Sequence, residues 1–278
     1  MKKLLLGTVL AVTAGGFSAC KEDQIQEEFG VFELEFDHKV GSSSLSISAW
    51  DDTNYPYTNA MGQVYNVTNF GYYITGVQLS GPDGAFLEDH IHSSANPDEV
   101  HGYYHILESE PASKSILLKD VPAGKYNQIS FTVGIPESGV QEGATGGILD
   151  PAAGAWFWNW DAGYIGLAVE GQSPSSPEVA GAFNPEHFVA VHIGGWKEVA
   201  SNPNMVNNTK VITLNFEAVN VGENLEPSAH LYADVAKVLD GPSANIDFTT
   251  NYSIHSPIKD QPFAGNLAEV FSVDHSHQ

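Results

Sequence analysis

The sequence predicts an all-β protein, an antiparallel β-sandwich with one or two short helices. Apolar and polar residues alternate along most of its patterned stretches, as they do in half-buried strands. Turn residues separate these stretches at fairly regular intervals. Helical spacing of apolar residues occurs only in the last part of the chain. These three observations favour a single β-sandwich over a mixed or helical fold.

The first expected strand, residues 31–38, alternates most clearly. Phe32, Leu34 and Phe36 share one face, and by the same parity His38 lies on that face too. Further strands are expected at residues 45–48, 70–79, 115–118, 129–135, 164–170, 188–193, 211–216 and 230–233.

Two segments predict helices, residues 234–239 and residues 262–271. In the second segment the apolar residues keep helical spacing, namely Phe263, Leu267, Val270 and Phe271. No linker is obvious in the chain and no exact repeat appears, so one domain over residues 31–278 fits best.

The stretch from residue 156 to residue 164 holds three of the five tryptophans. On a strand, alternate residues share a face, so Trp156, Trp158 and Trp160 would project to the same side. Such a ladder indicates an aromatic wall, a binding platform or redox chemistry. The simpler alternative is that the indoles fill the core of a sandwich.

Residues 1–19 have the pattern of a signal peptide, with a short basic start and a brief apolar stretch that is too short to span a membrane. The segment resembles a bacterial lipoprotein signal and ends before Cys20, the only cysteine, which we expect to be lipidated. Residues 20–30 read as an acidic tether, either an export signal or an ordinary spacer. We therefore expect a lipid-anchored protein of the outer membrane or cell surface, in contact with the membrane only through its anchor.

Composition excludes several classes of function. Removing residues 1–19 deletes two of the 11 basic residues and none of the 34 acidic ones, which gives 9 − 34 = −25 for the mature chain. Such an acidic surface argues against nucleic acid and is compatible with cations or a basic partner protein. A single cysteine excludes disulfides and thiolate-rich metal sites.

A series of short motifs, in order, resembles one known family. The pieces are Phe36-Asp37-His38, residues 59–65, 70–75, 118–126 and 133–135, Leu149-Asp150-Pro151, the tryptophan stretch through Gly163-Tyr164, Glu170-Gly171 and residues 191–194. Together they resemble the MbnP-like lipoproteins, named after the copper-binding partner protein of methanobactin operons. The resemblance spans about residues 31 to 275.

The resemblance implies a secreted β domain with a copper site. In the best-known members a tryptophan is oxidised to kynurenine by a partner di-haem peroxidase-like enzyme, and the modified side chain lies at a copper ion with histidine ligands. For this chain we expect Trp158 or Trp160 as the aromatic partner, with Trp160 preferred because the residues after it follow the family pattern.

Eleven histidines and three methionines favour imidazole ligands, which suit copper and also zinc. His38 and His192 are the expected pair, because each lies in an apolar strand and glycines 194 and 195 follow His192. Either histidine could instead be a hydrogen-bonded core residue. Secondary metal candidates are His90, His92, His101, His105, His275 and His277, with a polar loop and an unstructured tail as the alternatives.

Catalysis has little support, because no nucleophile elbow, phosphate-binding loop or zinc-protease motif is present. We therefore expect a binding protein and not an enzyme. The alternative to copper is a metal-independent module that binds glycan or peptide on a tryptophan platform.

Overall fold

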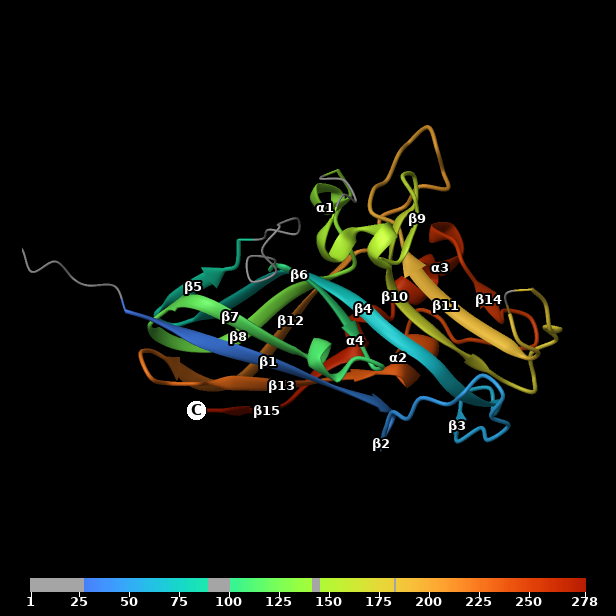
Figure 1. The fold of residues 1–278 in the computed structure, drawn as a ribbon, viewed down its shortest axis with the longest axis horizontal. Helices are drawn as coiled ribbons and strands as arrows, with labels where there is room; N and C mark the ends of the chain where they lie inside the picture. The colour runs from blue at the N-terminus through green and yellow to red at the C-terminus, as the bar shows by residue number, and fades with distance from the viewer. Residues whose placement is uncertain (1–27, 90–100, 142–145, 183) are drawn as a thin grey trace, which may run out of the picture.

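Two β-sheets packed face to face make up the structure (Figure 1). The computed structural model describes residues 28–89, 101–141, 146–182 and 184–278. The strands are β1 (Phe29–Val40), β2 (Ser43–Ser44), β3 (Tyr57–Thr58), β4 (Val64–Gly81), β5 (Gly84–Leu87), β6 (Tyr103–Leu107), β7 (Ser115–Pro122), β8 (Gly124–Val133), β9 (Phe157–Asn159), β10 (Gly163–Gln172), β11 (Phe188–Gly194), β12 (Lys210–Val221), β13 (Ser228–Asp234), β14 (Ser253–Ile254) and β15 (Phe271–His277). The α-helices are α1 (Glu137–Gln141), α2 (Val235–Leu239), α3 (Pro257–Ala264) and α4 (Leu267–Val270).

The larger sheet holds ten of the described strands in the order β12-β8-β4-β10-β11-β14, with β3, β5 and β6 paired to β4 and β9 paired to β10. Strand β4 is 18 residues long and pairs with β10 along its first half and with β8 along its second. The β4–β8 register shifts between Thr75 and Gln78, where Gly76 has a φ of 62°. Glycine takes this left-handed conformation without steric cost, so the long strand can bend at the bulge.

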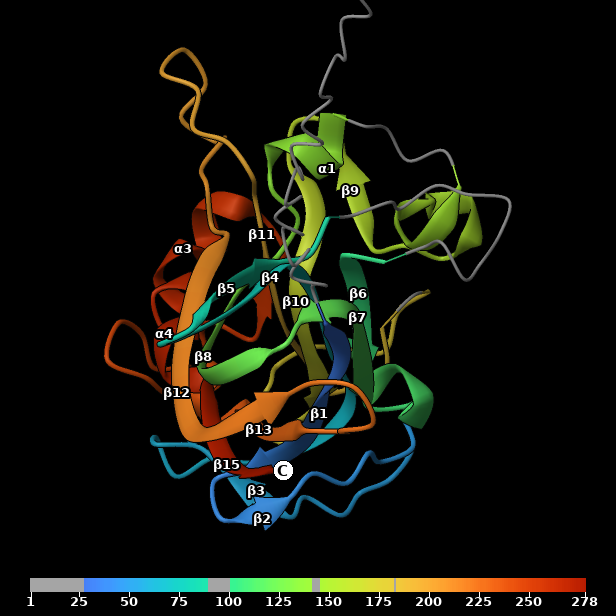
Figure 2. The same ribbon diagram turned by 90° about the vertical axis from the view of Figure 1, so that its left-hand side faces the viewer.

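The smaller sheet runs β15-β13-β1-β2, and β7 pairs with the first part of β1 along the edge opposite β13. Figures 1 and 2 both place β15 at the edge of the molecule opposite α1 and β9. Strand β15 thus lies far from the tryptophan stretch.

The main core lies between the two sheets. Phe32, Leu34, Phe36 and His38 of β1 are all buried on its inner face, which confirms the predicted parity. The Phe36 ring meets the Tyr72 ring of the larger sheet edge-on, with centroids 6.0 Å apart. The inner face of the larger sheet is therefore the face that carries Tyr72.

A second apolar cluster covers part of the other face of the larger sheet. It contains Tyr73, Tyr103, Ile135, Val140, Leu149 and Tyr164, with Trp156, Phe157 and Trp196 packed against it. Tyr72 and Tyr73 are neighbours on one strand and therefore point to opposite faces. We call the face that carries Tyr73 the outer face of the larger sheet.

The all-β sandwich predicted from the sequence is confirmed, although its sheets are mixed, because β1 pairs with β13 and β11 with β14 in parallel. Two element predictions differ from the structure. Residues 45–48 form an isolated bridge at Ile47 and not a strand. The helix expected at 262–271 begins at Pro257, ends at Ala264 and is followed by α4 and then β15. Within the described residues, none of the helices is both long and apolar enough to cross a membrane.

Candidate metal centre

His192 of β11 lies on the outer face of the larger sheet beside Glu170 of β10. The His192 Nε2–H donates to Glu170 Oε1 over 2.8 Å, and the Asn69 amide donates to the other carboxylate oxygen over 3.1 Å. In a neutral imidazole only one nitrogen carries a proton. The carboxylate therefore selects the Nε2–H tautomer of His192 and leaves its Nδ1 lone pair free to accept.

His255 faces this lone pair. Its Nδ1 atom lies 2.9 Å from the Nδ1 atom of His192, and the two rings are perpendicular, at 89°. Because the Glu170 contact leaves His192 as the acceptor, His255 donates the proton between the two nitrogens. A metal ion in place of that proton would be bound by both imidazoles. Glu170 would remain hydrogen-bonded to His192 Nε2, as is common for the second nitrogen of a metal-bound histidine.

Strand pairing brings the two histidines together. The two-residue strand β14 pairs in parallel with β11, with Ala190 opposite Ser253 and Val191 opposite Ile254. His255 follows directly, so it lies next to His192. His192 is 9% exposed, whereas His255 lies at the surface. The pair is thus held by a buried strand and open to solvent on one side.

Local electrostatics keep His255 neutral and Glu170 charged. Loss of hydration, and then the neighbouring His192, lower the pKa of His255 to about 4. Burial on its own would raise the pKa of Glu170, but hydrogen bonds from His192 and Asn69 lower it overall. Near neutral pH both groups are therefore in the state that metal binding requires.

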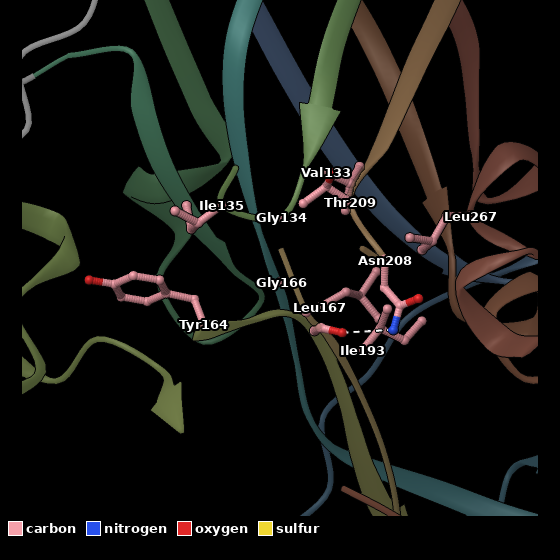
Figure 3. A pocket seen from close by; sticks show the side chains of 12 residues that line it. Val133, Gly134, Ile135, Tyr164, Gly166, Leu167, Ile193, Asn208, Thr209 and Leu267 are labelled. Atoms are coloured by element: carbon pink, nitrogen blue, oxygen red, sulfur yellow. Dashed lines mark hydrogen bonds between the residues drawn. The ribbon is translucent and has the colours of Figure 1, made fainter. Parts of the chain in front are cut away.

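Buried polar contacts fix the end of β11 just beyond His192. The Asn208 amide donates to the Gly194 carbonyl over 2.8 Å, drawn as the dashed line in Figure 3, and the Gly194 N–H donates to Asp260 over 3.0 Å. Asp260 on α3 has no exposed surface, and burial raises its pKa to about 9. The helix and the Asn208 loop thereby hold the strand that carries His192.

The three tryptophans of the 156–164 stretch do not form one ladder. Strand β9 ends at Asn159, and Trp160 lies in the turn after it, 58% exposed and packed edge-on against Phe157 with ring centroids 5.0 Å apart. Trp156 packs against His105, with ring centroids 4.4 Å apart. The expectation of a common face is wrong for Trp160, because the chain turns before that residue.

Trp158 lies next to the histidine pair along the sheet. A Cβ added to Gly194 would lie 2.7 Å from its ring, so glycine is needed for this close approach. Gly194 is two residues after His192 and therefore directs its missing side chain to the same face. Trp158 thus covers the outer face one step beyond His192.

His38 is in a different place from His192. Its Nδ1 bonds Glu108 over 2.8 Å and its Nε2 bonds the Tyr72 hydroxyl over 3.0 Å, so both ring nitrogens have protein partners. Burial lowers the pKa of His38 and outweighs the opposing effect of Glu108. Since His38 contacts Tyr72 on the inner face and His192 lies on the outer face, the expected joint site of His38 and His192 is not formed.

None of the secondary candidate histidines within the described residues lies at the His192–His255 pair. His105 stacks on Tyr73 with centroids 4.0 Å apart, and His101 lies 3.7 Å from Glu88. His275 and His277 are on β15 of the smaller sheet. His90, His92 and Cys20 lie outside the described residues.

His255 was missed from the sequence because it follows a strand of only two residues, which leaves no alternation to detect. The position of His255 in the sequence could have marked it as a candidate ligand. It is the only histidine between the apolar strand of residues 230–233 and the last helical segment.

Fold and site together define a β-sandwich protein with paired histidines on the outer face of its larger sheet. The sequence model of the MbnP family matches residues 30–256, and the chain belongs to this family. Among solved structures, MbnP from Methylosinus trichosporium is similar, with 13% identity and a TM-score of 0.46 over 87% of this chain and 97% of that chain. No curated protein matches the chain.

Proposed function

We propose that this protein binds copper through histidines near its tryptophan cluster and serves in copper acquisition or handling. Membership of the MbnP family, which is associated with copper handling, supports this function. The observation that carries it is the 2.9 Å approach of the two Nδ1 atoms of His192 and His255. Copper is here the bound ligand that the protein transports or stores, and not a cofactor of a reaction.

The donor set fits copper better than zinc. Two imidazoles converge at the pair, whereas structural zinc sites have four ligands and catalytic ones three protein ligands. Imidazole nitrogen suits copper, and the sequence has no second cysteine to complete a thiolate site. Glu170 orients His192, and the surface position of His255 leaves a route for the ion to enter.

Trp158 or Trp160 is the proposed site of oxidation to kynurenine by a di-haem peroxidase-like partner. Trp160 is exposed and so within reach of a partner enzyme, and Trp158 lies beside the strand that carries His192. Mass spectrometry of the peptide that contains both tryptophans, from protein of the native host, tests this branch. An unmodified peptide would exclude the kynurenine modification and would not bear on copper binding.

The protein is further proposed to be a lipoprotein of the outer membrane or cell surface, anchored through Cys20, and to bind without catalysing a reaction. Labelling of the native host with a fatty-acid analogue tests the anchor. The label should be incorporated into the parent chain. Incorporation into a Cys20→Ser variant would contradict anchoring through Cys20.

A second candidate function is glycan or peptide binding. Its support is the exposed Trp160, whose neighbours Asn159 and Asp161 line a groove together with Asn202 and Asn204. An indole beside polar groups is a common platform for sugars. Binding of a glycan that is lost in Trp160→Ala and unaffected by His255→Ala would favour this function.

Equilibrium dialysis of the full-length protein against copper tests the main proposal. We expect one tightly held copper ion, at least tenfold weaker binding in His192→Gln and His255→Gln, and unchanged binding in His38→Gln. The His38 variant is the matched control, because it removes a buried imidazole on β1 of the smaller sheet, in the core between the two sheets. A parent protein without bound copper, or copper lost only in the His38 variant, would overturn the assignment.

A further inference from the structure

Three histidines cluster on the outer side of the smaller sheet, away from the pair described above. One ring nitrogen from each of His230, His275 and His277 lies within 4.8 Å of the other two. The Nε2 atoms of His275 and His277 are 2.9 Å apart, and the ring of His230 stacks on that of His275 with centroids at 4.3 Å. Within the described residues, these histidines are the one group of three or more candidate metal ligands whose donor atoms lie this close together.

The sheet itself aligns these side chains. Glu35 of β1 is opposite His230 of β13, and His230 is opposite His275 of β15. Ala229 and Leu231, on either side of His230, are fully buried, so His230 points outward. His277 is two residues beyond His275 and shares its face.

We propose that His230, His275 and His277 form a second metal site, which takes a divalent ion of the zinc type. Two carboxylates lie beside the cluster: Glu35 Oε1 is 2.9 Å from His230 Nε2, and Asp274 accepts a hydrogen bond from His275 Nδ1 over 2.8 Å. Each contact fixes one nitrogen of its ring and leaves the other for the ion.

Three imidazoles with an open side are the protein ligands of many zinc sites that keep a fourth position for water. Zn–N bonds of about 2.0–2.1 Å at tetrahedral angles place ligand nitrogens about 3.3 Å apart. The present nitrogens lie within 4.8 Å of one another, so the three imidazoles would move closer together when they bind the ion. The excess of 34 acidic over 11 basic residues also attracts cations to the surface.

The test uses zinc alone as the probe. Calorimetric titration is done on full-length His192→Gln/His255→Gln protein, in which the histidine pair on the larger sheet is removed. We expect one zinc ion per chain, at least tenfold weaker binding after adding His275→Gln, and no measurable binding after adding both His275→Gln and His277→Gln. Zinc should also raise the melting temperature of the starting variant, because the ion joins β13 to β15, and should not raise that of the last variant.

The proposal is overturned if zinc affinity is the same with and without His275 and His277, or if the starting variant binds no zinc. Copper dialysis of His275→Gln/His277→Gln alone separates this outcome from a failure of the copper site. That variant should bind copper as the parent does, which also shows that it is folded. Loss of copper in that variant would instead mean that the β15 histidines form the copper site, and the second site would not exist as proposed.

Discussion

The Nδ1 atoms of His192 and His255 lie 2.9 Å apart although 63 residues separate them in the chain. The parallel pairing of β14 with β11 produces this approach, and the Glu170 carboxylate then determines which nitrogen of His192 faces His255. A short strand at the sheet edge is thus the element on which the proposed copper site depends.

Glu170→Gln should weaken copper binding about 10–100-fold without abolishing it, because the carboxylate orients His192 from the far nitrogen. The amide is nearly the same size, so the pair stays in place and only the charge is lost. Copper affinity is measured by competition with a chelator of known strength. Glu108→Gln, which removes the carboxylate partner of His38 on the inner side, is the matched control and should leave affinity unchanged. Equal losses in the two variants would contradict a specific role for Glu170.

The contribution of His105 to stability should fall with acid. Burial lowers its pKa to about 4, so the folded protein holds this imidazole neutral while the unfolded chain takes up a proton near its usual pKa of about 6.5. The unfolded state binds more protons in that interval, and stability is lost as pH falls from about 6.5 to about 4. We expect a loss of roughly 2 kcal/mol from this group between about pH 7.5 and about pH 5.

Urea unfolding of the parent and of His105→Phe at the two pH values measures this contribution as the difference between the two proteins, because Asp260 and His255 titrate alike in both. His105→Phe should remove most of it, because phenylalanine keeps the stacking on Tyr73 and cannot take up a proton. His187→Asn is the control, since asparagine tolerates the left-handed φ of 62° found there. A His105→Phe variant as acid-sensitive as its parent would show that the buried imidazole is not responsible.

Gly194→Ala should destabilise the fold by about 1–3 kcal/mol, the usual effect of overpacking a tight contact. The added methyl group would lie 2.5 Å from the Tyr164 carbonyl oxygen and 2.7 Å from the ring of Trp158, so the backbone or the indole would have to shift. Gly181→Ala is the control, because an added Cβ there meets nothing within 4 Å. Urea midpoints followed by tryptophan fluorescence compare the two, and similar midpoints would mean that the Trp158 contact is looser than described.

Alternation in the sequence was sufficient to predict the inner sheet face. Phe32, Leu34, Phe36 and His38 are buried together as expected, because a strand of 12 residues repeats the pattern often enough to be recognised. The same reasoning failed for Trp160, since β9 has only three residues and the chain turns after Asn159. Short elements carry too few repeats for periodicity to determine their ends.

The candidate site was predictable only in part. His192 was proposed as a ligand from its apolar strand and the glycines after it, and the structure places His255 beside it and Trp158 on Gly194. Its partner was assigned to His38 because the sequence does not reveal which strands are neighbours or which face of a sheet a residue from another sheet meets. His230 was likewise uninformative until the pairing of β13 with β15 placed it opposite His275.

A crystal structure of the copper-loaded protein, with anomalous diffraction at the copper edge, tests the central claim most directly. The account predicts one strong peak between His192 Nδ1 and His255 Nδ1, with the Glu170 contact to His192 Nε2 retained. A peak at His38, or a fully loaded protein in which the two Nδ1 atoms still share a hydrogen bond, would contradict it.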